Sequence, residues 1–340
     1  MTDRPRNFFL CVLLFICLPR LCAAGGRYAG ASLELGVGAR PLALAGAAAA
    51  LSGRAETFYY NPASLALLKR PMLSLMYAPT FGSIRSPMAN YHHAGLTLPL
   101  PGGGTAALNW TRFSVDDIPI YPALRGRSFP ERDRDITLRP DGTALGYFQD
   151  TEDVFYFSFA RPFNFELPLG WLYIDLPIEI PVGLNLKLLR QSLYDASASG
   201  LGVDLGVMIR FSLGTLLEKN YLGRLCLGVS AIDLTQTSVI WSTKHQDRIH
   251  RTVLLGLAYE HRRGLRGAVL RLYYTQRSKY EITDLFGGEL AYRGLAVRLG
   301  YNGSGLTAGA GFGFWRLLLD YAFVATDFDD LHRMSCALRL

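Results

Sequence analysis

After its first 24 residues, this chain of 340 residues has no apolar run long enough to cross a membrane as a helix. The longest candidate, Pro41–Leu51, is far shorter than the roughly 20 apolar residues that such a helix needs. An α-helical membrane protein is therefore excluded. Hydrophobic residues nevertheless make up 50% of the sequence, which is high for a water-soluble protein.

Cysteine is scarce, and charge is not concentrated anywhere. Of five cysteines, only Cys226 and Cys336 lie beyond the first 24 residues, far apart in the sequence, so no disulfide framework is expected. The formal net charge of +7 falls to +5 when the first 24 residues are left out, and lysine and arginine are spread along the chain. No basic patch indicates nucleic-acid binding.

The N-terminus has the order of a secretory signal peptide. Arg4 and Arg6 precede the apolar run Phe8–Leu18, and small residues follow up to Ala24. We therefore expect residues 1–24 to be removed during export. In the alternative, Cys22 is acylated as in a lipoprotein; the bulky residues just before it disfavour this.

From Met72 onwards the chain repeats one unit, in which every second residue is apolar over eight to twelve positions and a turn rich in Gly, Pro, Asn or Asp follows. This period of two predicts strands with two unlike faces. Between Ile178 and Leu188 one face is Ile, Val and Leu, whereas the other carries Glu179, Gly183, Asn185 and Lys187. Small residues with scattered charges are typical of the wet interior of a membrane barrel, and the apolar face would contact lipid.

The fold class predicted is all-β: a transmembrane antiparallel β-barrel of about 14 strands. An even number of strands allows the sheet to close, which leaves no unpaired edge in hydrocarbon. The expected strands are 72–78, 91–98, 104–113, 153–160, 178–190, 200–211, 223–233, 251–260, 267–276, 286–292, 295–302, 306–314, 317–324 and 332–339.

The links between these strands predict the orientation of the barrel. Short turns at Pro99–Gly103, His261–Arg266 and Arg293–Gly294 would face the periplasm. Longer links at Pro79–Asn90, Ser114–Glu152 and Leu234–His250 would face outside. The links 161–177 and 212–222 are longer than this rule predicts, so each should contain a short helix or a further strand.

Residues 25–70 differ in texture from the barrel of residues 71–340 and predict two short helices. Pro41 suits a first helical position, and the Ala-rich run up to Leu51 continues from it. Asn61 is a candidate N-cap, with Pro62 in the first turn of a second helix over Ala63–Leu68. Such a segment could plug the barrel as a hatch.

Two motifs in this segment, GARPLALAG and FYYNPASLA, resemble the N-terminal signature of the FadL-like outer-membrane proteins. That family includes long-chain fatty-acid and hydrocarbon transporters and the PorV-like barrels of a bacterial secretion system. The final hairpin, with LLLDYAFV and HRMSCALRL, is similar to the PorV-like branch, although the chain ends on Leu340 and not on an aromatic residue. The resemblance implies a fourteen-stranded barrel in the bacterial outer membrane, surrounded by its lipid. It places these residues in the hatch motif: Gly38, Ala39, Arg40, Pro41, Gly46, Asn61, Pro62 and Ala63.

The leading functional hypothesis is passive uptake of hydrophobic or amphipathic small molecules such as long-chain fatty acids, without a cofactor. Such a ligand needs an apolar pocket beside a cation. The inward-facing candidates for the cation are Lys187, Arg210, Arg271, Arg298 and Arg339. In the alternative interpretation, these cations only neutralise Glu179, Asp204, Glu260 and Asp320 across the interior.

A second class of function remains open. The barrel would then be a platform or shuttle for a secreted or periplasmic protein, as in the PorV-like branch, or a structural surface protein. The link Ser114–Glu152 would form the exposed partner surface.

Enzyme function is disfavoured, because no histidine lies in a local Ser or Cys nucleophile signature. No metal site is expected either. His92 and His93 are adjacent in a strand and point to opposite faces. The acidic residues Asp327, Asp329 and Asp330 lack the glycine and terminal glutamate of a calcium loop.

Overall fold

The computed structural model describes residues 29–121, 128, 144–170, 174–219, 221–262, 267–325 and 330–340. The expected signal peptide, Asp327 and Asp329 lie outside these residues, as do residues 122–127 and 129–143 of the predicted Ser114–Glu152 link. The two ends of that link are paired strand, because Ser114–Ile120 pairs with residues 146–151. Within the described residues, no helix is long and apolar enough to cross a membrane.

Strands dominate the fold. Those of the first half are β1 (Met72–Ser83), β2 (Ser86–Pro99), β3 (Thr105–Ile120), β4 (Gly146–Leu169), β5 (Ile174–Leu193), β6 (Ala196–Ser212), β7 (Arg224–Ile232), β8 (Ser238–Trp241) and β9 (Gln246–Arg248). Those of the second half are β10 (Thr252–Arg262), β11 (Val269–Ser278), β12 (Ile282–Tyr292), β13 (Leu295–Tyr301), β14 (Leu306–Phe314), β15 (Leu317–Val324) and β16 (Leu331–Arg339).

The sheet closes into an antiparallel barrel of fourteen strands, as predicted. Sequence neighbours pair around the ring, β1 pairs with β16, and β7 pairs with both β6 and β10. The remaining two strands, β8 and β9, form a hairpin within the link 234–250, and β8 pairs with Ala198–Gly200 near the start of β6. Closure satisfies the backbone groups that a free edge would leave unpaired in lipid.

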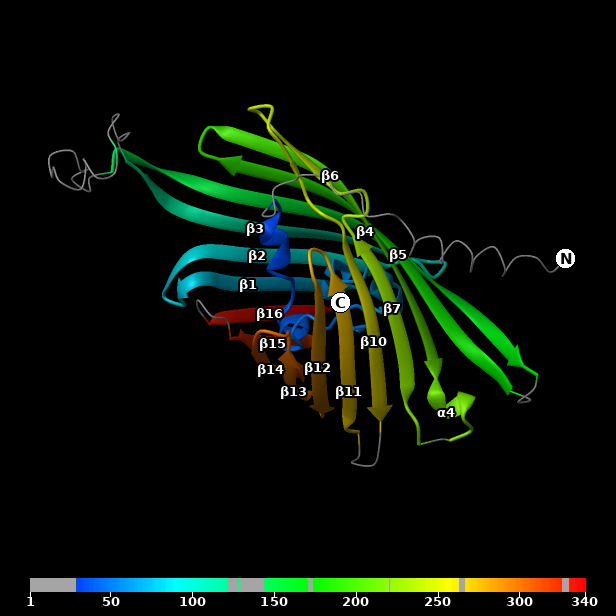
Figure 1. Cartoon of the computed structure of the whole chain (residues 1–340). Helices are drawn as coiled ribbons and strands as arrows, with labels where there is room; N and C mark the ends of the chain where they lie inside the picture. The colour runs from blue at the N-terminus through cyan, green and yellow to red at the C-terminus, as the bar shows by residue number, and fades with distance from the viewer. Residues whose placement is uncertain are drawn as a thin grey trace.

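Each of the fourteen predicted segments corresponds to one strand of the ring, but several strands are longer than predicted. The extreme case is β4, with 24 residues where 153–160 was predicted. The link 161–177 is thus mostly the paired ends of β4 and β5, and the link 212–222 contains the short helix α4 (Leu213–Leu216). The prediction of a long link at Pro79–Asn90 is wrong, because β1 and β2 pair through it up to Ser83 and Ser86. Strands β3–β6 are longer than β13–β16, and Figure 1 shows that they extend well beyond them.

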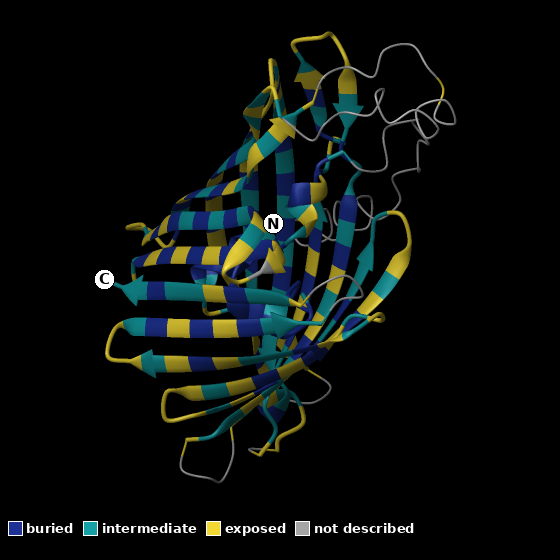
Figure 2. Cartoon of the chain, turned by 90° about the vertical axis from the view of Figure 1, so that its left-hand side faces the viewer, coloured by how far each residue is buried: buried dark blue, intermediate teal, exposed yellow. Residues whose placement is uncertain are grey.

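The two faces of the wall differ as the alternation predicts. On β5, the outward Leu186 is 44% exposed, whereas the inward Lys187 is 1% exposed. Figure 2 shows this alternation as bands across the strands. The outward face is apolar, with Leu, Phe, Val and Ile, which suits contact with lipid. Cys226 and Cys336 are both free thiols on separate strands.

The segment before β1 lies inside the ring (Figure 1). It contains the short helices η1 (Ala31–Glu34), α2 (Ala39–Ala43), η2 (Ala55–Tyr59) and η3 (Pro62–Leu67). The helix predicted up to Leu51 is wrong beyond Ala43, because Ala45 and Gly46 adopt positive φ values of 56° and 76° that end it. Pro41 is the third residue of α2, not the first. The prediction for Asn61 is confirmed: its side chain accepts from the backbone N–H of Ala63 and caps η3, which is a 3₁₀ helix.

Inward-facing glycines allow this segment to contact the backbone of the wall. A Cβ atom at any of them would lie within 3.0 Å of residues 43–63. They come from seven different strands: Gly183, Gly206, Gly228, Gly256, Gly287, Gly300 and Gly309. The small inward residues of the sequence pattern are therefore the surface on which the N-terminal segment packs. We call these seven glycines the glycine bed.

This bed gives a first prediction. In Gly183→Ala, the new methyl group would overlap the backbone of Pro62 and Ala63, so the barrel should lose about 2 kcal/mol of stability, as overpacked cores do. Urea unfolding, followed by the fraction that runs as a folded band on unheated gels, measures this. Gly288→Ala is the control, because its methyl group would have no neighbour nearer than 3.9 Å. Equal stability of the two variants would contradict the close packing.

Candidate ligand cavity and lumen charge network

The N-terminal segment is held to the wall by hydrogen bonds from several strands. The side chains of Asn185, Ser230 and Thr307 donate to the backbone oxygens of Phe58, Tyr60 and Ala43, at 3.1, 2.6 and 3.0 Å. Within the segment, the amide of Asn61 donates to the Ala49 oxygen at 2.7 Å and so ties η3 to the Ala-rich stretch. Buried backbone oxygens thus find donors without a continuous helix.

Glu289 on β12 is the centre of a buried charge network. Arg40 of α2 contacts its carboxylate with two nitrogens, at 2.8 and 3.0 Å. Arg271 and Arg298 reach the same carboxylate at 2.6 and 2.7 Å. A bidentate Arg–carboxylate pair is strong and directional, so Arg40 fixes α2 against this side of the wall. The first group of hatch-motif residues lies in or beside α2: Gly38, Ala39, Arg40, Pro41 and Gly46. The second group lies at the start of η3: Asn61, Pro62 and Ala63.

Four of the five cations singled out from the sequence are paired with carboxylates. Lys187 lies 2.8 Å from Asp204 and 2.7 Å from Asp233, and Arg210 lies 2.8 Å from Glu179. Arg271 contacts Glu260 as well as Glu289, and Arg298 contacts Asp320 at 2.7 Å. The pairs named in the alternative interpretation are thus present. Arg339, at the end of β16, has no ion pair among the described residues.

The N-terminal segment also carries charge near this network. Arg54 lies 3.5 Å from Asp320. Glu56 is buried, and burial raises the pKa of its carboxyl against the opposing effect of Arg54. A raised pKa favours the neutral acid.

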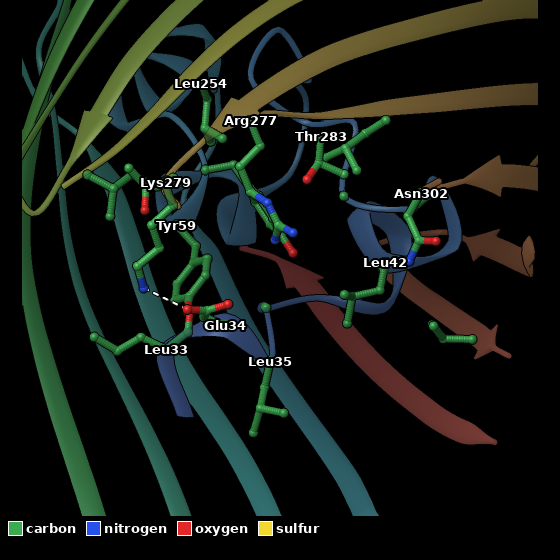
Figure 3. A pocket seen from close by; sticks show the side chains of 18 of the residues that line it. Leu33, Glu34, Leu35, Leu42, Tyr59, Leu254, Arg277, Lys279, Thr283 and Asn302 are labelled. Carbon is green, nitrogen blue, oxygen red and sulfur yellow. Dashed lines mark hydrogen bonds and ion pairs between the residues drawn. The ribbon is translucent and has the colours of Figure 1, made fainter. Parts of the chain in front are cut away.

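A cavity of about 410 Å³ lies on the other side of α2, at the end of the barrel that carries the 234–250 link. We call it the outer cavity. Much of its lining is apolar, with Leu33, Leu42, Leu254 and Leu285 among the residues. Figure 3 shows Arg277 and Lys279 reaching into it, with Lys279 held by Glu34 at 2.6 Å. Lys187, with its two aspartates, also lines the cavity.

Arg333 on β16 differs from Lys187 and Lys279, which also line this cavity but pair with carboxylates. It is 1% exposed, and its Nη1 donates to Thr80 at 3.1 Å. Its Nε and Nη2 are buried without a hydrogen-bond partner, and within the described part of the chain no carboxylate pairs with it. The guanidinium lies over the ring of Tyr91 at 5.7 Å, and the hydroxyl groups of Tyr60 and Tyr91 also lack partners. A cation that is buried without a carboxylate partner is energetically costly.

Sequence reasoning missed Arg333 although the signal was present. It lies six residues before Arg339 on the same strand, and the period of two places both side chains on the inward face. The alternation alone could not distinguish it from the paired arginines, because the pairing partners come from other strands.

Ser74 and His93 form a hydrogen-bonded pair in the interior. The Ser74 hydroxyl lies 3.1 Å from Nε2 of His93, and Nδ1 of His93 lies 3.2 Å from the Trp110 oxygen. His93 points inward and His92 outward, as predicted. Phe58 stacks on His93 at 5.7 Å and covers the pair, which does not line the outer cavity. It therefore acts as a hydrogen-bonded part of the core.

Comparison with known proteins assigns no family. No family model matches the chain, and no curated protein matches it. Among solved structures, the alignment with a TodX monoaromatic hydrocarbon channel mutant covers 83% of this chain and 92% of the TodX chain, with 10% identity and a TM-score of 0.37. The alignment with CdiB from Acinetobacter baumannii covers 80% of this chain and 60% of the CdiB chain, with 11% identity and a TM-score of 0.39. A mutant of the Rh. blastica porin overlaps 79% and 98%, with 9% identity and a TM-score of 0.30.

The charge network gives a second prediction. In Glu289→Gln, Arg40, Arg271 and Arg298 lose their shared carboxylate, so the variant should be about 3 kcal/mol less stable than the parent. The same urea measurement tests this. Glu166→Gln, at an exposed position on β4, is the matched control and should change stability by less than about 0.5 kcal/mol. If both variants unfold at the parent's urea concentration, Glu289 is not the centre of the network.

Proposed function

We propose that this chain is a transport protein of the bacterial outer membrane for the passive uptake of hydrophobic small molecules with an anionic end, such as long-chain fatty acids. The observation that carries the proposal is the unpaired, buried Arg333 in a mainly apolar cavity. An alkyl chain would lie against the leucines of the outer cavity, and its carboxylate would accept hydrogen bonds from Arg333 and the nearby tyrosines. The apolar outer face of the closed barrel supports the membrane location.

The resemblance of GARPLALAG and FYYNPASLA to FadL-like proteins agrees with this proposal. In such a transporter, residues 29–68 would act as the hatch. Passage would require this segment to shift, because it lies between the outer cavity and the opposite end of the barrel.

A platform for a secreted or periplasmic protein is the second candidate. The observation that favours it is the number of points at which the N-terminal segment is tied to the wall, since a segment held by Arg40, Asn61 and the glycine bed resists displacement. In this case the outer cavity would hold no diffusing ligand.

Binding of a labelled long-chain fatty acid to the purified barrel separates these two proposals. We expect saturable binding that weakens about tenfold in Arg333→Gln, as the loss of one charge-assisted hydrogen bond implies. Arg333→Lys should retain part of the affinity because the charge remains. Arg190→Gln, which removes an exposed cation from the outer face, should bind as the parent does.

A fatty alcohol of the same length provides the ligand control. Without a carboxylate, it should bind the parent and Arg333→Gln equally. Absence of saturable fatty-acid binding by the parent, or equal affinity of the parent and a folded Arg333→Gln variant, would reject the transport proposal.

A further inference from the structure

A second cavity, of about 460 Å³, lies at the opposite end of the barrel, where the C-terminal strand ends. The tight turns β12–β13 and β14–β15 form its rim. Its inner boundary is the N-terminal segment at Arg40 and Ser52–Arg54. The same short segment lines the outer cavity through Leu42 and Gly46. One stretch of chain thus separates two cavities at opposite ends. We call the second one the basic vestibule.

Arginine dominates the lining of the basic vestibule. Six arginines line it, and Glu289 is its one acidic residue among the described lining residues. The six are Arg40, Arg54, Arg271, Arg293, Arg298 and Arg339. Glu289 is shared by three of them, and Asp320 pairs with Arg54 and Arg298. Arg293 and Arg339 have no carboxylate partner in the described part of the chain.

Three of these arginines have hydrogen-bonding capacity to spare. Nε of Arg54 lies 3.5 Å from Asp320 as an ion pair but makes no hydrogen bond. Arg293 lies over the ring of Tyr292 at 5.1 Å, and neither it nor Arg339 pairs with a carboxylate in the described part of the chain. Guanidinium groups that converge on one cavity bind planar or tetrahedral oxyanions in preference to other groups.

Exposed apolar side chains line the same cavity at its rim. Leu295 is 58% exposed, Phe312 48% and Trp315 80%. Leu295 and Phe312 are partners across β13 and β14 and lie on the outward face of the wall, so they present one continuous apolar surface on the lipid side of the rim, across the wall from the inward arginines. A ligand that satisfies both parts of the cavity has a charged head and an apolar tail.

We infer that the basic vestibule is a second binding site, specific for the oxyanion head of an amphipathic molecule whose tail lies on Leu295, Phe312 and Trp315. The oxyanion is a carboxylate if the ligand has passed through the barrel, and a phosphate if it is a lipid of the adjacent leaflet. The site goes beyond the proposed function, because it shares no ligand-binding arginine with the outer cavity and exists whether or not that cavity binds fatty acids.

Native mass spectrometry of the full chain in a neutral detergent tests this site in the Arg333→Gln background, which removes the buried cation of the outer cavity that has no carboxylate partner among the described residues. The probes are dodecanoate, phosphatidylglycerol and, as the uncharged control, dodecanol. The test variant adds Arg54→Gln and Arg339→Gln, which remove two vestibule cations without touching Glu289. The matched control adds Arg316→Gln, an exposed arginine next to Trp315 that does not line the vestibule.

We expect the Arg333→Gln and Arg316→Gln forms to retain an anionic probe at least about tenfold more tightly than the test variant, which corresponds to about 1.4 kcal/mol. Dodecanol should bind all forms equally. Selective loss of dodecanoate identifies a transported carboxylate, and selective loss of phosphatidylglycerol identifies a membrane lipid. Equal retention of both anionic probes by test and control variants, or retention of neither by any form, would overturn the inference. Fatty-acid binding by the parent is measured separately, so failure of the transport proposal leaves this comparison intact.

Discussion

The close contact between the N-terminal segment and the inner wall is the constraint on which the rest of the structure depends. A strand can approach another backbone this closely only where it has no side chain, and the wall offers glycine on seven strands. Because the segment lies on this bed, its polar backbone is satisfied by wall side chains such as Ser230 and Thr307. The segment divides the interior into an outer cavity and a basic vestibule.

The N-terminal segment fills much of the interior and buries charged side chains there. Those that pair with an opposite charge hold elements of the fold together. Arg40, Arg271 and Arg298 share Glu289, and Lys187 lies between two aspartates. These groups hold elements together. Arg333 keeps two buried nitrogens without hydrogen bonds, and Arg54 is held by Asp320 only at 3.5 Å; the two arginines line different cavities. The groups with the fewest partners are therefore the ones that the two proposed binding sites use.

The sequence was sufficient to predict the ring of strands, because a period of two and turn residues are local signals. It also predicted the Asn61 cap, which depends on neighbours two residues away. It failed at the Ala-rich stretch, where helix propensity favoured a helix up to Leu51 but positive φ values at Ala45 and Gly46 end it, and Ala49 lies against Gly228 and Gly256 of the wall. Arg333 was missed for the same reason: its lack of a partner is a property of the assembled interior.

Hydrogen–deuterium exchange of the full chain in lipid nanodiscs tests the central claim, that residues 39–67 are fixed inside the barrel, most directly. The account predicts that peptides from this segment exchange as slowly as those from β12 and β13, and far more slowly than the exposed turn 302–305. Exchange of residues 39–67 as fast as that turn would show that the segment is not held by the wall, and would contradict the division of the interior into two cavities.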